Sequence, residues 1–171
     1  MRHPTSKRAV RHHVVMRRRL TVLLIALLAA TCGSTALAQV QSAAVRNGGP
    51  GNDRLVGTAG SDRLNGRGGN DRIGGRGGAD RLTGGPGNDL LFGDAGRDVL
   101  QGGPGNDQLL GGGGSDRLQG GRGNDVLIGG AGNDAISAQD GASDRISCGP
   151  GNDRVASRDS SDVVNGDCER R

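Results

Sequence analysis

The stretch "GGPGNDQLLGGGGSDRLQGGRGNDVLI", residues 102–128, decides the fold because it consists of three copies of one nine-residue pattern. Each copy begins with a glycine-rich segment and has an aspartate in its sixth position, at Asp107, Asp116 and Asp125. An aliphatic residue always follows two positions later. Self-similarity at a fixed short period is typical of a solenoid, in which each repeat packs only on its neighbours.

The nonapeptide recurs without a gap over residues 48–137. Its sixth position holds Asp53, Asp62, Asp71, Asp80, Asp89, Asp98, Asp107, Asp116, Asp125 and Asp134. Its eighth position holds Leu55, Leu64, Ile73, Leu82, Leu91, Leu100, Leu109, Leu118, Leu127 and Ile136. After one inserted residue in "AQDGASDRIS", the pattern resumes with Asp144/Ile146, Asp153/Val155 and Asp162/Val164.

Each nonapeptide predicts a six-residue turn followed by a three-residue strand. Glycine permits the positive φ angles and close backbone approaches of a tight turn. In the strand, the middle aliphatic side chain points to one face and its two neighbours point to the other. Two nonapeptides complete one coil, so repeats n and n+2 stack about 4.8 Å apart. We therefore expect an all-β fold, a parallel β-roll with two short-stranded sheets.

Composition indicates that a hydrophobic core alone cannot hold this roll together. All three histidines precede residue 39, and Phe92 is the sole aromatic residue. Stacked carboxylates about 5 Å apart repel each other by roughly 3 kcal/mol per pair at an effective dielectric near 20. A hard divalent cation between successive turns reverses that sign, and calcium suits an irregular cage of carboxylate and carbonyl oxygens better than magnesium does. Metals that prefer thiolate or imidazole find too few ligands here.

The pattern resembles the repeats-in-toxin (RTX) nonapeptide G-G-x-G-x-D-x-U-x, which forms a calcium-bound parallel β-roll. This resemblance implies that the aspartate and loop carbonyls of one turn share each calcium with the next turn on the same side. One edge would then carry Asp53, Asp71, Asp89, Asp107 and Asp125, and the other Asp62, Asp80, Asp98, Asp116 and Asp134. We expect about eight well-formed sites between these aspartates. Asp144 and Asp153 are further candidate ligands.

The repeat departs from the family pattern at two kinds of position. Glycine is replaced in the second position by Thr58, Arg67, Arg76 and Asp94, whereas the fourth position keeps its glycine throughout residues 48–137. The last repeat, "SRDSSDVVN", contains no glycine, so Asp162 is not expected to bind metal as the others do.

The N-terminal segment predicts export. Basic residues precede the apolar run "LTVLLIALLAA" and an "ALA" cleavage site, which is typical of a signal peptide over residues 1–38. Cys32 as a lipidation site and Arg17-Arg18 as a twin-arginine signal are the alternatives. Residues 39–47 would be a short lead-in, residues 48–165 the roll and residues 166–171 a tail. After cleavage, 15 arginines face 18 carboxylates, a net charge of −3.

Cys148 and Cys168 would be the two cysteines left in the exported chain. They lie about one coil apart, which favours a disulfide-closed C-terminal cap in an oxidising compartment. Two free thiols are the alternative.

The outward strand positions differ between the two sheets. An apolar stripe on one sheet predicts self-association or a cell-surface or polysaccharide partner, and its members are Leu90, Phe92, Leu110, Val126 and Ile128. The other sheet presents Arg63, Arg81, Arg117, Gln101 and Gln119. We expect these arginines to balance the charge of the aspartates rather than to bind nucleic acid, because aromatic residues for base stacking are lacking.

The sequence favours a secreted, extracellular binding or structural module that folds on calcium, not an enzyme. No histidine remains for a Ser-His or Cys-His couple, and the apolar run is too short to span a membrane. Collagen and EF-hand patterns are excluded, and glycine-rich disorder describes the calcium-free state better than the whole protein. Alternative functions are a surface adhesin or matrix protein, or an accessory module of a separately encoded secreted enzyme.

Overall fold

The computed structural model describes residues 43–165 and 167–168. The expected signal peptide lies outside the described residues. The described chain contains fourteen β-strands and no helix. Each strand contains an aliphatic residue that follows a repeat aspartate, except at the N-terminal end, where β1 precedes the first nonapeptide.

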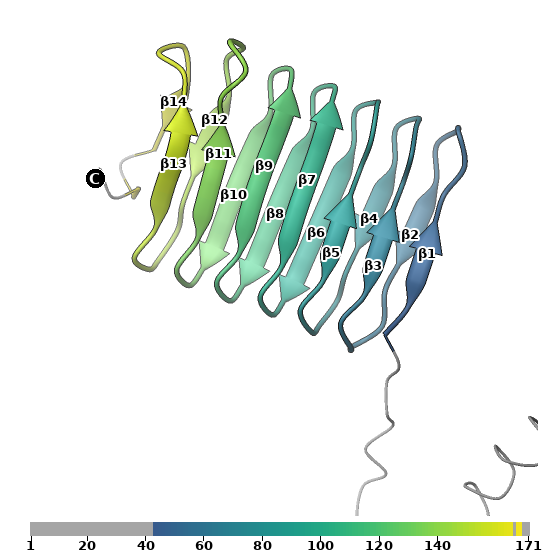
Figure 1. Cartoon of the computed structure of the whole chain (residues 1–171). Helices are drawn as coiled ribbons and strands as arrows, with labels where there is room; N and C mark the ends of the chain where they lie inside the picture. Colours follow the sequence, from purple (N-terminus) through teal and green to yellow (C-terminus); the bar gives the residue numbers. More distant parts are fainter. Residues whose placement is uncertain (1–42, 166, 169–171) are drawn as a thin grey trace, which may run out of the picture. The chain divides into compact units, whose positions relative to one another are not determined.

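The strands form two seven-stranded sheets in which every pair of neighbours is parallel. Sheet A holds β1 (Val45–Asn47), β3 (Arg63–Asn65), β5 (Arg81–Thr83), β7 (Val99–Pro104), β9 (Arg117–Arg122), β11 (Ala135–Ala138) and β13 (Arg154–Arg158), in that spatial order. Sheet B holds β2 (Arg54–Val56), β4 (Arg72–Gly74), β6 (Leu90–Ala95), β8 (Gln108–Gly113), β10 (Val126–Ala131), β12 (Arg145–Ser147) and β14 (Val163–Val164). In Figure 1, the strands of the front sheet point one way and those of the back sheet point the opposite way.

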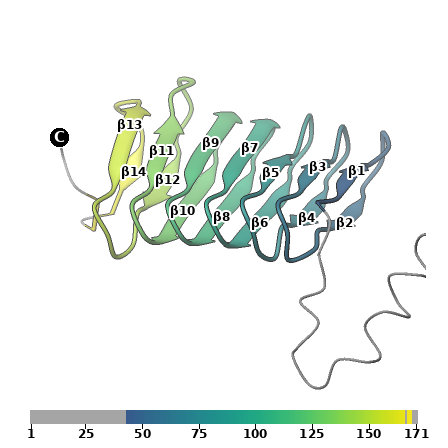
Figure 2. The ribbon, with the colours of Figure 1, turned by 60° about the horizontal axis from the view of Figure 1, so that its bottom comes forward.

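The register confirms the predicted parallel β-roll. Leu82 pairs with Leu100, and Leu100 with Leu118, so equivalent residues two repeats apart stand side by side. The chain therefore climbs one coil for every two nonapeptides. The turns of successive coils line up along both edges of the roll (Figure 2).

The strands differ in length, although the sequence predicts three residues for each. β2 to β5 have three residues, whereas β6 to β10 have six. In the longer strands, the pairing continues into the following turn, as between Asp94 and Gly112 and between Gly112 and Gly130. Glycine allows this because the backbones of the stacked turns can approach closely.

The core is a thin double column of aliphatic side chains between the sheets. Residues in the eighth position from Leu64 to Ile146 are at most 1 % exposed. At the N-terminal end, Arg46 of β1 pairs with Leu64 and so occupies the place of an aliphatic residue. It is exposed and ends the column with a polar group. β1 lies in the segment that the sequence predicts to be a lead-in.

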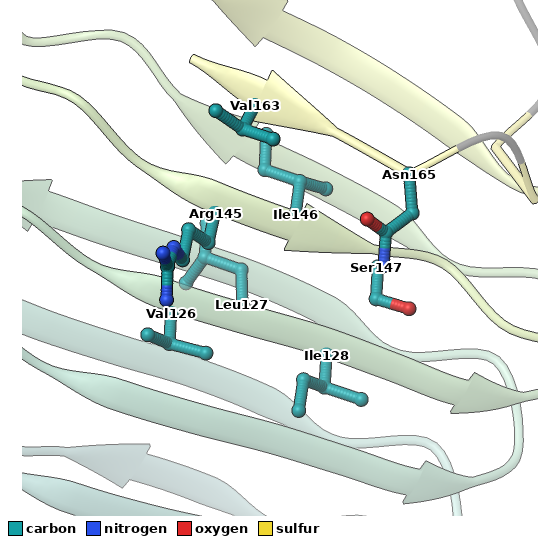
Figure 3. A pocket seen from close by; sticks show the side chains of 8 residues that line it. All are labelled: Val126, Leu127, Ile128, Arg145, Ile146, Ser147, Val163 and Asn165. Carbon is teal, nitrogen blue, oxygen red and sulfur yellow. The ribbon is translucent and has the colours of Figure 1, made fainter.

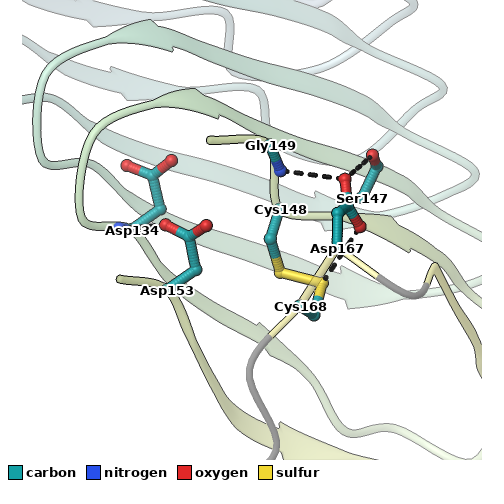
Figure 4. Close-up of a disulfide and its surroundings, with 7 residues drawn as sticks. All are labelled: Asp134, Ser147, Cys148, Gly149, Asp153, Asp167 and Cys168. Carbon is teal, nitrogen blue, oxygen red and sulfur yellow. Dashed lines mark hydrogen bonds between the residues drawn. A yellow bond between two sulfur atoms is a disulfide. The ribbon is translucent and has the colours of Figure 1, made fainter. Parts of the chain in front are cut away.

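The C-terminal end absorbs the inserted residue and is covalently closed. The inserted residue is taken up between β11 and β12, because Val126 of β10 pairs with Arg145 and the ladder bond from Asp125 to Asp144 spans 19 positions instead of 18. A separate register shift lies between Ile136 and Ser137, where β11 pairs with β13. Cys148 and Cys168 are joined by a disulfide, with their Cα atoms 5.1 Å apart (Figure 4). Because Cys148 is fully buried and packs in the core cluster, the bond fixes the tail to the last coils.

Candidate metal sites

The repeat aspartates point into the roll at its two edges. Eleven of them, from Asp62 to Asp153, are at most 3 % exposed, and Asp53 is partly buried. An ionised carboxylate in such a place costs several kcal/mol unless it is paired. The geometry around their two oxygens therefore determines what these turns can bind.

One oxygen of each carboxylate ties successive coils together. The Oδ1 atom of Asp107 accepts the backbone N–H of Asp89 at 2.7 Å, and the Oδ1 atom of Asp125 accepts that of Asp107 at 2.8 Å. The same bond links Asp53, Asp71, Asp89, Asp107, Asp125, Asp144 and Asp162 along one edge, and Asp62, Asp80, Asp98, Asp116, Asp134 and Asp153 along the other. These two ladders follow the predicted edges. Figure 4 shows Asp134 and Asp153 as neighbouring rungs.

The second oxygen has no hydrogen-bond partner within the described residues in ten of these carboxylates. The ten buried Oδ2 atoms belong to Asp71, Asp80, Asp89, Asp98, Asp107, Asp116, Asp125, Asp134, Asp144 and Asp153. Since buried polar atoms in folded proteins are nearly always satisfied, these oxygens indicate a missing positive ligand.

At six of these oxygens, a backbone carbonyl from the next coil lies beside the same first-position glycine; they belong to Asp71, Asp80, Asp98, Asp107, Asp116 and Asp134. A Cβ atom built on Gly93 would lie 2.6 Å from Asp98 Oδ2 and 2.5 Å from the carbonyl oxygen of Gly111. At Gly129, the corresponding atoms are Asp134 Oδ2 at 2.5 Å and the carbonyl oxygen of Cys148 at 2.7 Å. The first-position glycine thus leaves room beside oxygens from two successive coils. Only hard oxygen ligands meet there, which suits calcium.

The turns that form these places share an unusual backbone conformation. From the third to the tenth repeat, both the second and the fourth residues have positive φ. In the second position, this includes Arg67 at 81°, Arg76 at 79° and Asp94 at 71°, where a side chain costs about 1–2 kcal/mol. This backbone strain cannot be predicted from the sequence, which shows that residues other than glycine occur in the second position but not which φ angle they adopt.

Burial and neighbouring carboxylates raise the pKa of the interior aspartates. Desolvation is the largest cause, and it raises the pKa of Asp98 and Asp107 to about 6 and that of Asp125 to about 7. Asp107 and Asp144 add to the rise at Asp125 because they are like charges on the same ladder. A positive ion beside these carboxylates would favour their ionised form and so counter the rise in pKa.

The aspartates at the two ends are satisfied differently. Asp53 Oδ2 accepts the N–H of Gly49 at 2.6 Å, and Asp62 Oδ2 accepts that of Thr58 at 2.5 Å. At the C-terminal end, the Oδ2 of Asp162 accepts the N–H of Asp159 at 2.6 Å. These terminal carboxylates close their own turns and present no orphaned oxygen.

A comparison with protein families identifies the repeat. The family model described as RTX calcium-binding nonapeptide repeat (4 copies) matches overlapping segments at residues 47–82, 74–109, 83–118, 110–144 and 140–167. These segments cover well over half of the chain. The chain belongs to the RTX calcium-binding nonapeptide repeat family. RTX repeats bind calcium, and the ladder of buried aspartates agrees with this property. No curated protein matches the chain.

Side chains alone do not complete a metal site in these RTX turns. Among the described residues, no group of three or more histidine, cysteine, aspartate or glutamate side chains is placed to hold one ion. Calcium takes six to eight oxygen ligands. Most ligands must therefore be backbone carbonyls, which explains why the turns are rich in glycine rather than in carboxylates.

The predicted apolar stripe lies on the outer face of sheet B. Phe92, Leu110 and Ile128 stand in register across β6, β8 and β10, and Ile128 is 37 % exposed. Beyond them, a shallow hollow is lined partly by Val126, Ile128 and Val163 (Figure 3). The guanidinium of Arg72 lies 4.7 Å from the centre of the Phe92 ring. In the part of the chain that the structure describes, no helix is long and apolar enough to cross a membrane.

Proposed function

We propose that this protein is a secreted module that folds when it binds calcium outside the cytoplasm and then acts as a binding or structural element rather than as an enzyme. The observation that supports this is the row of ten buried Oδ2 atoms without a partner in the described residues. A positive ion beside each of them would replace several unpaired buried charges with ligand bonds.

The proposed ligands are the Oδ2 atoms of the repeat aspartates together with first-position carbonyls of the next coil. The interior aspartates, from Asp71 to Asp153, are the principal ligands because their second oxygen is free to bind. Asp53 and Asp62 stand at the N-terminal ends of the ladders and are weaker candidates, since each already accepts a bond from its own turn. Four intervals between five aspartates on each edge give the expected total of about eight ions.

Export fits this chemistry. Extracellular calcium modules have dissociation constants of about 10⁻⁴ to 10⁻³ M, so the chain would stay unfolded inside the cell and fold outside it. A signal peptide over residues 1–38 would deliver it by that route. In an oxidising exterior, the bond between Cys148 and Cys168 would close the C-terminal end.

The test compares two aspartates in the same repeat position. In Asp107→Asn, the amide oxygen can still accept the N–H of Asp89, but the charge at the orphaned oxygen is lost. We expect the calcium concentration at half-folding to rise about tenfold, equivalent to about 1.4 kcal/mol, and fewer ions to bind per chain. Asp53→Asn is the matched control and should stay close to the wild type. Equal effects of the two variants in calorimetric titration would contradict the proposed ligands.

Self-association is a second candidate role, supported by the register of Phe92, Leu110 and Ile128. If this stripe joins two copies, Phe92→Ser with Ile128→Ser abolishes any calcium-dependent oligomer in sedimentation velocity. A different protein that co-purifies with the chain when the stripe is unchanged would favour the surface adhesin or the enzyme accessory over self-association. A sedimentation profile that is unchanged by the two substitutions would exclude the stripe as the interface.

A further inference from the structure

The charges of the roll are separated between its interior and its surface. Residues 43–168 contain 13 arginines and 17 aspartates, and no lysine, histidine or glutamate. Eleven of these aspartates are buried, whereas all 13 arginines are exposed. Outside the ladders, the 13 arginines are accompanied by four aspartates, which are Asp94, Asp140, Asp159 and Asp167. The outer surface is therefore cationic although the sum of the charges is negative.

The seventh-position arginines point away from the ladder aspartates. An arginine in the seventh position follows its aspartate directly, so its side chain leaves the opposite face of the backbone. The ladder aspartates from Asp62 to Asp153 are at most 3 % exposed, whereas the arginines are exposed. Arg46 differs because it stands at the end of the core column. The remaining arginines are free to attract a partner.

Sheet A arranges these arginines in a row across the strands. Arg63 pairs with Arg81, and after Val99 the same row continues with Arg117. Beyond Ala135, it ends with Arg154. Neighbouring strands are about 4.8 Å apart, so the row places guanidinium groups at multiples of that spacing.

A second row on the same face consists of neutral hydrogen-bonding side chains. It runs in register through Asn47, Asn65, Thr83, Gln101, Gln119 and Ser137. Among the described strands of sheet A, no outward position carries a carboxylate. The face thus combines a line of positive charge with a line of amides and hydroxyls.

We propose that the outer face of sheet A binds an acidic polysaccharide that runs across its strands, along the axis of the roll. This inference rests on the proposed function, because calcium must first fold the roll and bring the repeats into register. The arginines pair with carboxylate or sulfate groups of the polymer, and the amides and hydroxyls bond its sugar hydroxyls.

A polysaccharide fits this face better than a nucleic acid does. Proteins that bind single-stranded nucleic acids use aromatic side chains to stack the bases. The sole aromatic residue of the chain, Phe92, projects from sheet B. A linear polysaccharide that carries one charge on each short repeat unit can pair those charges with the row of arginines on this face.

Two triple variants with the same change of charge test the proposal. Arg63→Gln, Arg81→Gln and Arg117→Gln remove the row from sheet A, and Arg54→Gln, Arg72→Gln and Arg145→Gln remove three seventh-position arginines from sheet B. Binding of hyaluronate and heparin is measured in calcium, with calcium uptake and circular dichroism measured on the same samples. We expect the sheet A variant to bind about tenfold more weakly and the sheet B variant to change little.

The outcomes separate this surface from the calcium sites. A failure of the wild-type chain to fold in calcium refutes the proposed function. A wild-type chain that folds in calcium but binds neither polymer refutes only the surface. Equal losses in the two variants mean unspecific attraction and overturn the assignment to sheet A. If single-stranded DNA binds more tightly than either polysaccharide, the proposed ligand class is wrong. If the unfolded chain in chelator binds the polysaccharides as well as the folded chain does, the folded face is not required.

Discussion

The interior turns of the roll and the turns at its ends are built from nearly the same nonapeptide, yet they satisfy their aspartates in opposite ways. In the interior, Asp107 ties two coils through Oδ1 and leaves Oδ2 buried without a partner in the described residues. In the first turn, Gly49 donates its N–H to Asp53 Oδ2. In the last repeat, Asp159 donates to Asp162.

On the proposed function, this difference identifies the turns that depend on metal. The end turns are complete as polypeptide, and the C-terminal end has a disulfide in addition. The interior turns of the third to the tenth repeat have positive φ in their second and fourth positions, and their aspartates have an Oδ2 without a hydrogen-bond partner in the described residues. We therefore expect the ends to hold their local structure without metal and the interior to need a bound cation.

The largest contrast is expected from one glycine position. Gly105 has a φ of 143°, and a Cβ atom there would collide with the carbonyl oxygen of Gly87. Gly105→Ala should destabilise the calcium-bound roll by about 3 kcal/mol or more. The equivalent Gly51 of the first turn has open space around it, so Gly51→Ala should be nearly neutral. Urea denaturation in calcium measures both, and similar losses would show that the two turns do not differ.

Loss of the disulfide should weaken the C-terminal end by about 3 kcal/mol in the chain-entropy model, since the bond closes a loop with a sequence separation of 20. The paired substitutions Cys148→Ser and Cys168→Ser should expose β12 and β14 to hydrogen exchange and leave β8 protected. Reduction of the wild-type chain is the parallel treatment. Uniform loss of protection along the roll would contradict a local role.

Acid should partly replace the cation in the interior. The folded pKa of Asp98 and Asp107 is about 6 and that of Asp125 about 7, against 3.8 for an ordinary aspartate. A raised pKa favours the folded state at low pH, and this stabilisation is lost as the pH rises through the folded values. The calcium-stripped chain should therefore show more strand signal in circular dichroism at about pH 4 than at about pH 8. Identical spectra at the two pH values would be inconsistent with buried, proton-binding ladders.

The smallest changes in stability are expected from two substitutions in the second position, one stabilising and one destabilising. Arg76 has a φ of 79°, so Arg76→Gly removes strain and should stabilise the roll by about 0.5–1 kcal/mol. Thr58 donates its hydroxyl to Asp62 at 3.1 Å, so Thr58→Gly should cost about 1 kcal/mol. Thermal denaturation in calcium compares them, and a gain of stability from both would mean that the first turns are as strained as the interior.

The sequence predicts the repeat, the parallel roll and the two edges correctly, because the period alone determines which residues stack. It does not reveal that Asp107 uses one oxygen as a structural acceptor, since that depends on the distance between stacked backbones. Nor does it separate Asp53 from Asp107, because both occupy the sixth position and differ only in the conformation of the turn. The strand β1 is also hidden, since "VRN" lacks a preceding glycine-rich turn.

The most direct test is a calcium titration of the purified chain at about pH 7, followed by circular dichroism and by hydrodynamic radius. The account predicts an expanded chain without strand signal in excess chelator, and a compact, strand-rich protein at roughly 10⁻⁴ to 10⁻³ M calcium. A compact, strand-rich chain in excess chelator at that pH would contradict it. So would a chain that stays expanded when calcium is plentiful.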